Sequence, residues 1–420
     1  MLETYFVRPQ TVDRIRASWI GTEVESCTVW LAEQGYSTRS VLRRVPLVVA
    51  FGEFARERGA AKVEDLPMHV AAFVSKRVTE YQGPRAGLVA ELTKEVRGPI
   101  EQMLRVVVPG FQGMGRRHYP DPFADAVPGF FEYLATERGL RPASICAYRH
   151  HLDRFAAYLT RVGAEVSELS PALLSAFVVD RSRAGLAKST VRGTCGALKV
   201  FLHYAHRQGV LAADLSETVE WPQVYRLSTI PRSISWAQVG EVLARVDRRT
   251  PCGKRDYAIL LLLVTYGLRG REVAALTLDD IGWRRERLAV PERKAGHSTA
   301  FPLSSVVGDA LADYLQHGRP QAADRHVFFR AVAPVRPIGA AAVSCCARQY
   351  LLKAGVQVPR PGSHTLRHTA VQRLVDDGFS LKTIGDFIGH RSAKSTEIYA
   401  KVDVERLREV ALGDGEEVLR

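Results

Sequence analysis

The chain has 420 residues, of which 46% are hydrophobic, and it carries 58 lysines and arginines against 45 aspartates and glutamates. This length predicts two or three domains, and the apolar fraction excludes a disordered chain. The formal charge of +13 favours a polyanionic partner such as nucleic acid. The start, Met1 to Phe6, lacks the features of a signal peptide, and the longest apolar run, Ala258 to Val264, is too short to span a membrane.

Cysteine spacing indicates the redox environment. None of the six cysteines belongs to a CxxC pair, and the chain is too long to be a disulfide-stapled small domain. We therefore expect reduced, mostly buried thiols in a cytosolic protein. The six are Cys27, Cys146, Cys195, Cys252, Cys345 and Cys346.

The first half of the chain repeats itself. A shift of 104 positions places Gly35–Arg77 on Gly139–Arg181, and the tripeptide that begins at Val96 recurs at Val191 after a shorter connection. The pattern predicts one helical module used twice, with a chance alignment as the alternative. Identical pairs include Gly59/Gly163, Phe51/Phe155, Phe73/Phe177, Val74/Val178 and Arg77/Arg181.

Apolar spacing predicts helices throughout the second copy. A buried stripe recurs at three- and four-residue steps through Ile145, Tyr148, Leu152, Phe155 and Leu159. Ser170-Pro171 is typical of a helix start, and Ser189-Thr190 of another, whose apolar face comprises Leu198, Phe201, Leu202 and Ala205. Four or five helices fit residues 121–215. Segments 109–122 and 221–232, rich in proline, glycine or arginine, are predicted linkers.

The C-terminal half mixes helices with a short hairpin. Ser235 to Gln238 forms a capping box, and the apolar segment 256–266 predicts a buried helix that ends at Gly267. Residues 288–290 and 300–303 predict strands joined by a turn over 293–298. Further helices are expected at 306–315, 338–354, 368–376, 381–388 and 393–402. The predicted fold is mainly α with a small β-sheet in the last domain.

Four motifs carry the chemistry. The run from Tyr266 to Glu272 contains Arg269; the run His364-Thr-Leu-Arg367-His368 lies about a hundred residues later; Gly389-His390 and then Tyr399 follow. Metal-free cleavage of a phosphodiester needs a nucleophile, cations on the phosphate oxygens, an acid for the leaving oxygen and a hydrogen-bond donor. Arginine, histidine and tyrosine side chains can fill these roles.

These motifs, in this order and spacing, resemble the tyrosine recombinase (phage integrase) family. The resemblance implies that Arg269 and Arg367 bind the scissile phosphate, with Glu272 orienting the first arginine. It further implies roles for His364 as general acid/base, Lys294 as the acid for the leaving 5′ oxygen, His390 as a donor to the phosphate, and Tyr399 as nucleophile. Many family members have a second basic residue beside the lysine, where this chain has His297-Ser298-Thr299.

Other interpretations of the histidines are weaker. His368 lies four residues after His364 and is interpreted as a packing residue that supports the site. A zinc site at this pair is disfavoured, because the glutamate of an HExxH motif is missing and Arg367 would repel a cation. No cofactor and no metal are therefore expected.

The repeat predicts a front helical module at 1–115, as a second copy of the domain that follows. The resemblance implies a helical core-binding domain at 119–222 that clamps DNA, and a mixed α/β catalytic domain at 230–420. Expected partners are double-stranded DNA with specific recombination sites and further copies in a homotetramer, with related recombinases as alternative co-subunits. No membrane is involved, and the expected location is the cytoplasm of a bacterium, at the nucleoid.

The expected function is site-specific recombination through a 3′-phosphotyrosyl intermediate, in the integration, excision or transposition of a mobile element. Three alternatives stay open: a chromosome or plasmid dimer resolvase, a type IB topoisomerase-like activity and a non-catalytic DNA-binding relative. For the front module, basic residues favour DNA over a role in subunit assembly, although acidic residues are interspersed. The basic residues are Arg39, Arg43, Arg44, Lys76 and Arg77.

Overall fold

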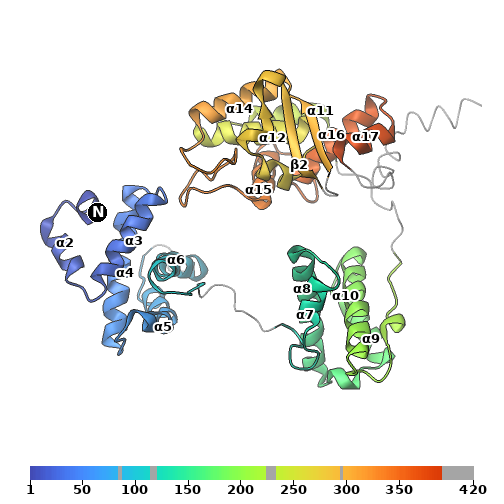
Figure 1. Ribbon diagram of the computed structural model, residues 1–420, viewed down its shortest axis with the longest axis horizontal. Helices are drawn as coiled ribbons and strands as arrows, with labels where there is room; N and C mark the ends of the chain where they lie inside the picture. Colours follow the sequence, from blue (N-terminus) through green and yellow to red (C-terminus); the bar gives the residue numbers. More distant parts are fainter. Residues whose placement is uncertain (84–87, 114–120, 224–232, 294–296, 390–420) are drawn as a thin grey trace, which may run out of the picture. The chain divides into compact units, whose positions relative to one another are not determined.

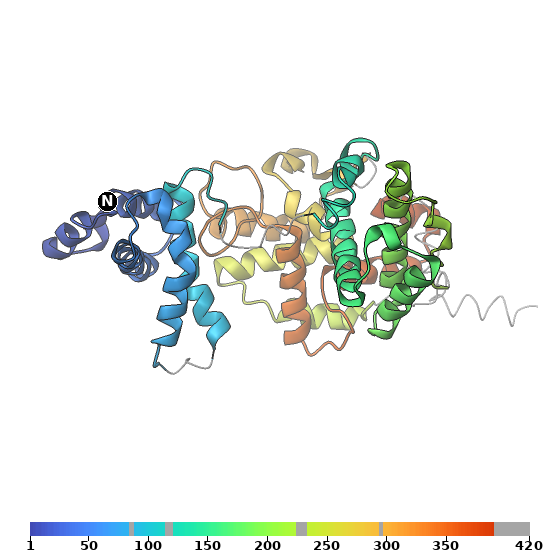
Figure 2. The ribbon, with the colours of Figure 1, turned by 90° about the horizontal axis from the view of Figure 1, so that it is seen from below.

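A computed structural model describes residues 1–83, 88–113, 121–223, 233–293 and 297–389, with the side chains of 292–298 excluded. The chain divides into two compact units, one comprising Met1–Gly113 with Thr229–Arg420 and the other Met114–Ser228 (Figure 1). Both units are predominantly helical, as the ribbon also shows when it is seen from below (Figure 2). Within the described residues, no helix is long and apolar enough to cross a membrane.

The front module, in the first unit, is a bundle of helices around its own apolar core. Phe51, Val70, Phe73, Ile100 and Met103 are almost completely buried in this core. The helices are α1 (Leu2–Tyr5), α2 (Pro9–Arg16), α3 (Gly21–Glu33), α4 (Thr38–Glu57), α5 (Leu66–Thr79) and α6 (Val89–Val107), with a 3-10 turn η1 (Val63–Asp65) before α5.

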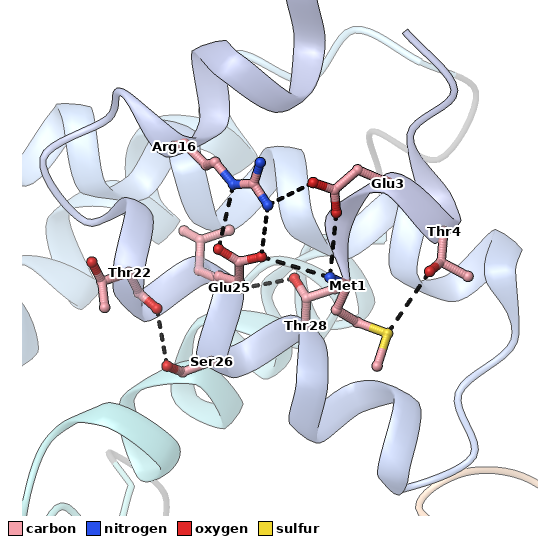
Figure 3. Close-up of polar contacts among 9 residues, drawn as sticks. Met1, Glu3, Thr4, Arg16, Thr22, Glu25, Ser26 and Thr28 are labelled. Atoms are coloured by element: carbon pink, nitrogen blue, oxygen red, sulfur yellow. Dashed lines mark hydrogen bonds and ion pairs between the residues drawn. The ribbon is translucent and has the colours of Figure 1, made fainter. Parts of the chain in front are cut away.

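An ion-pair cluster ties the first three helices of this module together (Figure 3). The Arg16 guanidinium lies 2.6 Å from Glu3 and 3.1 Å from Glu25, and the amino group of Met1 lies 3.3 Å from Glu3. A backbone hydrogen bond and the Arg16 guanidinium lower the pKa of Glu3 to about 2. Because these groups are exposed, they orient the helices more than they stabilise them.

The second unit contains four α-helices in its described part. They are α7 (Phe130–Thr136), α8 (Pro142–Val162), α9 (Pro171–Arg183) and α10 (Lys188–Arg207), with 3-10 turns η2 (Val166–Glu168) and η3 (Ser216–Thr218). The predicted stripe of α8 packs inward, with Leu152, Phe155 and Leu159 buried. Ser170 caps α9 as predicted, since its hydroxyl accepts the Leu173 N–H at 3.3 Å. The predicted helix start at Ser189 was one residue too late. Helix α10 begins at Lys188 and has no side-chain cap at its N-terminus.

The two copies of the sequence repeat have the same order of elements. Helices α4 and α8, the turns η1 and η2, α5 and α9, and finally α6 and α10 follow one another at corresponding positions. Each core contains the same aromatic pair, with ring centroids 5.4 Å apart for Phe51 and Phe73 and 4.9 Å apart for Phe155 and Phe177. The repeat in sequence therefore corresponds to a repeat in local structure.

The C-terminal part of the first unit, from residue 233, combines helices with a three-stranded antiparallel sheet in the order β1-β2-β3 (Figure 1). Strands β2 and β3 form the predicted hairpin, with Arg293 opposite His297. The elements are α11 (Trp236–Ala244), α12 (Pro251–Thr265), α13 (Gly270–Ala275), η4 (Leu278–Asp280), β1 (Ile281–Gly282), η5 (Trp283–Arg285), β2 (Arg287–Arg293), β3 (His297–Pro302), α14 (Ser305–His317), α15 (Ala340–Lys353), α16 (Ser363–Asp376) and α17 (Leu381–Ile388).

Most helix predictions for this part are confirmed. Ser235 and Gln238 form the reciprocal capping box, α17 has the predicted bounds, and Gly267 follows α12 with a left-handed φ of 57°. The predicted starts of α12 and α16 were each five residues too late, at 256 instead of Pro251 and at 368 instead of Ser363, and α13 was not predicted. Segment 393–402 lies outside the described residues.

The shared aromatic pair yields a stability prediction. Replacing Phe155 by alanine removes a fully buried ring from the second unit, so we expect a loss of about 3–5 kcal/mol. Phe51→Ala should cost a similar amount in the front module, where the ring is equally buried. Hydrogen exchange should show the added amide exposure confined to the module that carries the change, and a loss spread over the whole chain would contradict separate cores.

Candidate active site

The loop after α12 holds Arg269 beside a buried carboxylate. Arg269 immediately precedes α13, and Glu272 lies in the first turn of that helix. One Glu272 oxygen accepts the backbone N–H of Arg269 at 2.8 Å, and the other accepts Nη1 of its guanidinium at 2.7 Å. The Glu272 side chain is 2% exposed. This carboxylate therefore sets both the start of the helix and the direction of the arginine, the role expected from the sequence.

Arg367 comes from α16 and reaches the same place. Its side chain is 6% exposed, and Nη1 lies 4.0 Å from Glu272. Nη1 also donates to the carbonyl of Gly267, and Nη2 donates to the carbonyl of Ile388 at 2.9 Å. These carbonyls lie at the C-terminal ends of α12 and α17, where the helix dipole attracts a cation. Arg269 and Arg367, which are distant in sequence, thus both lie beside Glu272.

The segment that leads to His390 is attached to this pair. Gly389 ends α17 in a left-handed conformation with a φ of 65°, which favours glycine. Its carbonyl accepts Nη2 of Arg269 at 3.1 Å. His390 is the next residue, although it lies outside the described residues. The residue that follows α17 is therefore hydrogen-bonded to Arg269.

Three aromatic rings connect the segments that carry the motifs. The Tyr266 ring, just before Gly267, lies 5.2 Å from Phe301 of β3, which lies 5.0 Å from Phe387 of α17. The Tyr266 hydroxyl also donates to the Pro302 carbonyl at 2.9 Å and accepts the Ser304 N–H at 2.9 Å. These contacts position the hairpin relative to the arginines. No role for Tyr266, Phe301 or Phe387 was predicted from the sequence motifs.

His364 lies in the first turn of α16, three residues before Arg367, and its side chain is exposed. Desolvation, followed by the charges of Arg367 and Arg269, lowers the pKa of His364 below its ordinary value. The two arginines therefore act electrostatically on this histidine, which favours its neutral form at neutral pH. A neutral imidazole can accept a proton or donate one from its N–H.

His368 also lies on α16, with its ring centroid 6.4 Å from that of His364. It is half-buried and does interact with its surroundings, which agrees with a packing role. In the described part of the chain, no group of three histidine, cysteine or acidic side chains is arranged to hold a metal ion.

The structure brings together Arg269, His364 and Arg367, with Glu272 between the arginines. Lys294, in the connection between β2 and β3, lies outside the described residues, as do His390 and Tyr399. The backbone carbonyls of Gly267, Ile388 and Gly389 belong to the site but could not be found from side-chain motifs. Gly267 and Gly389 could have indicated these carbonyls, because each glycine follows the end of a helix and its carbonyl accepts a hydrogen bond from an arginine.

Comparison with known proteins places this site in a family. Residues 233–406 match the sequence model described as Phage integrase family, and residues 127–209 match Phage integrase, N-terminal SAM-like domain. The first match contains all six predicted site residues. The second match covers α7 to α10, whereas the front module lies outside both matches.

Curated relatives match most of the chain. The chain is 33% identical over 386 residues to "Putative integrase/recombinase y4rA" of Sinorhizobium fredii, which covers 91% of each chain. It is 29% identical over 294 residues to Tyrosine recombinase XerD of Ralstonia nicotianae, covering 69% of this chain and 93% of the relative. The chain therefore belongs to the phage integrase family of tyrosine recombinases, and it is a DNA breaking-and-rejoining enzyme.

Solved structures share the fold. XerH site-specific recombinase bound to palindromic difH substrate matches with a TM-score of 0.55 and 16% identity, over 83% of this chain and 96% of that one. A lambda integrase dimer bound to a COC' core site matches with a TM-score of 0.53 and 16% identity, over 76% and 91% of the two chains. At this identity the likeness concerns the fold alone.

The lowered pKa of His364 yields a prediction. NMR titration should give a pKa below 6.5, and Arg269→Ala should raise it, since removing a nearby cation makes protonation easier. The unfolded chain binds this proton more readily, so the contribution of His364 to stability should fall as pH drops through its unfolded pKa, around 6.5. Arg271→Ala, which removes an exposed neighbouring arginine, is the matched control and should leave the pKa unchanged. Equal shifts in both variants would contradict the assignment.

Proposed function

We propose that this protein is a site-specific recombinase that cleaves DNA with Tyr399 and joins it to a new partner through a 3′-phosphotyrosyl intermediate. The convergence of Arg269 and Arg367 beside His364 supports this proposal most strongly. Two guanidinium groups near one neutral histidine form a site for the oxygens of a single phosphate. Tyr399 lies ten residues after Gly389, whose carbonyl is bonded to Arg269.

The proposed cleavage step balances without an external energy source. The Tyr399 oxygen bonds to phosphorus, its proton passes to a base such as His364, and the 5′ oxygen leaves with a proton from Lys294. In the reverse step, a 5′ hydroxyl of the partner strand attacks phosphorus and the Tyr399 oxygen leaves. Each step exchanges one phosphodiester bond for another, so rejoining requires no ATP.

In this mechanism, the two arginines stabilise the negative charge that develops on the phosphate. Negative charge grows on the non-bridging oxygens as the fifth bond to phosphorus forms. Preorganised donors aimed at that charge are typically worth about 10²–10³ in rate each. Glu272 and the carbonyls of Gly267, Ile388 and Gly389 supply this preorganisation. His390 would add a further donor to the same phosphate.

Duplex DNA with specific recombination sites is the proposed substrate, and a homotetramer on two such sites is the proposed assembly. The matched XerH and lambda integrase structures are complexes with the difH substrate and a COC' core site, respectively. The y4rA relative matches nearly the whole chain, whereas the XerD relative leaves about a third of it uncovered. This difference favours an integrase of a mobile element over a dimer resolvase, acting in the bacterial cytoplasm.

The nucleophile can be tested directly. Tyr399→Phe removes only the attacking oxygen, so DNA binding should persist while covalent adduct formation stops. A suicide substrate, nicked near the cleavage site, traps the adduct in the unchanged protein and provides the assay. An SDS-resistant DNA adduct formed by the phenylalanine variant would show that another residue attacks. Tyr257→Phe, at a partly buried tyrosine of α12, is a matched control that should still form the adduct.

The role of Lys294 can be tested through the leaving group. Lys294→Ala should cleave ordinary DNA slowly, because the 5′ oxygen leaves without its proton donor. A substrate with sulfur at that position should be cleaved at nearly the normal rate, since a thiolate leaves without protonation. The measurement is the ratio of single-turnover rates on the two substrates. An equal defect on both would exclude the acid role.

A further inference from the structure

Arginines stacked on aromatic rings are a recurrent feature of the second unit. In its described part, four arginines lie with the guanidinium over such a ring. Stacking uses only the flat face of the group, so the N–H donors along its edges can still bind a partner. In three of the four, a carboxylate of the same unit takes up these donors. The three pairs are Arg149–Asp121, Arg161–Asp180 and Arg207–Glu137, with distances of 2.6, 2.6 and 3.0 Å.

Arg192 of α10 is the fourth of these arginines, and its edges have no such partner. Its guanidinium carbon lies 5.1 Å from the centroid of the Trp221 ring. The residue is exposed and makes no hydrogen bond or ion pair with another described residue. The indole therefore holds one face of the guanidinium, while the donors along its edges remain hydrated. A planar donor set that is already held in place suits the oxygens of a phosphate.

The Trp221 ring is itself held in place by the end of the unit. Val219, two residues earlier, is 2% exposed and belongs to the core of this unit. The ring lies against Gly196 of α10, where an added Cβ would be 3.7 Å from it, in ordinary van der Waals contact. Gly196 is four residues after Arg192, so both lie on one face of the helix. Trp221 is nevertheless 46% exposed, so burial in the core does not explain its position.

A second cation shares the ring but is already neutralised. The Lys199 ammonium lies 5.3 Å from the centroid of the Trp221 ring, and it also lies 3.4 Å from Glu217. Lys199 is seven residues after Arg192 and therefore on the same face of α10. Of the two cations on this ring, Arg192 is thus the one whose charge is left for a ligand.

Other basic groups lie next to Arg192. A Cβ at Gly193, the next residue, would be 3.2 Å from Nε2 of His151 on α8. Desolvation, followed by the charges of His150 and Arg181, lowers the pKa of His151, so these two groups lie near it as well. Arg181 makes no ion pair with another described residue. Cationic groups from three helices therefore gather beside Arg192, and such a surface attracts a polyanion.

We propose that Arg192 binds a backbone phosphate of duplex DNA, and that Trp221 is the positioning residue that holds its guanidinium in place for this contact. The inference rests on the proposed function, which makes DNA the polyanion. A phosphate contact adds affinity and fixes the position of the protein on the duplex, but it reads no sequence. Trp221 is also the first residue of the predicted linker 221–232, so this linker begins at a residue that packs against the DNA-binding helix.

The first test measures the salt dependence of DNA binding by the full chain. The probe is a fluorescent duplex of mixed sequence, and binding is followed by anisotropy over a range of salt concentrations. Arg192→Ala should lower the slope of log affinity against log salt by about 0.9, the value for one phosphate contact. Arg207→Ala removes the same charge from the same helix and is the matched control. Its slope should equal that of the unchanged chain, because Glu137 already occupies this arginine. An unaltered slope in Arg192→Ala overturns the phosphate contact.

The role of Trp221 needs a test that a merely structural residue would fail. At one salt concentration, Trp221→Ala should weaken binding about two- to tenfold, because the guanidinium must then be ordered during binding. Trp221→Phe keeps an aromatic face and should restore most of the affinity. In the Arg192→Ala background, Trp221→Ala should have no further effect, since no guanidinium is left to position. Equal effects of Trp221→Ala in both backgrounds overturn the positioning role.

This inference and the proposed function fail through different results. A chain that forms the covalent adduct on a suicide substrate, but whose DNA affinity does not respond to Arg192→Ala, overturns the phosphate contact and leaves the Tyr399 chemistry intact. An unchanged chain that binds duplex DNA with a slope dependent on Arg192, but forms no adduct, overturns the chemistry and supports the contact.

Discussion

A single buried carboxylate organises the candidate active site. Two arginines near one another repel, and burying either of them is unfavourable without a partner. Glu272 provides that partner, since it bonds to Arg269 and lies 4.0 Å from Arg367. The same side chain closes the first turn of α13 by accepting the Arg269 backbone N–H. Helix geometry and charge placement therefore depend on one residue.

The arginines in turn hold the ends of two helices. Arg367 donates to the carbonyls that follow α12 and end α17, and Arg269 donates to the carbonyl of Gly389. Orphan carbonyls at helix ends require donors, and a charged donor also compensates the dipole. The guanidinium groups proposed to bind phosphate thus also hold the ends of these two helices. Lysine offers one point charge and cannot serve several fixed acceptors in one plane, so it would disturb both roles.

The first half of the chain contains the same order of helices twice. Both modules have the same aromatic pair in the core, where all four rings are buried. The surfaces of the two modules differ. After the shift of 104 positions, His150, His151 and Arg154 stand where Pro46, Leu47 and Ala50 occur in the front copy.

Local features were predictable from the sequence because they depend on nearby residues. Apolar spacing and caps located α8, α12 and α17, and the turn chemistry of 293–298 predicted the hairpin. The α13 helix was missed because six residues are too few to establish a period, and the start of α16 was missed because its first turn is polar around Ser363 and His364. The order of the motifs identified the candidate site residues; the structure brings Arg269, His364 and Arg367 together, and the catalytic roles of all six residues remain predictions.

Only the tertiary structure decided which groups meet. Arg269 and Arg367 are separated by nearly a hundred residues, and no periodicity encodes their common contact with Glu272. The carbonyls of Gly267, Ile388 and Gly389 became ligands of the arginines because two helices end at the same point, and backbone groups carry no sequence signal. Arg192 likewise meets Trp221 because the segment after η3 packs back against α10. Sequence determined the elements and the chemistry of the side chains, whereas packing over long separations in the chain determined the site and these contacts.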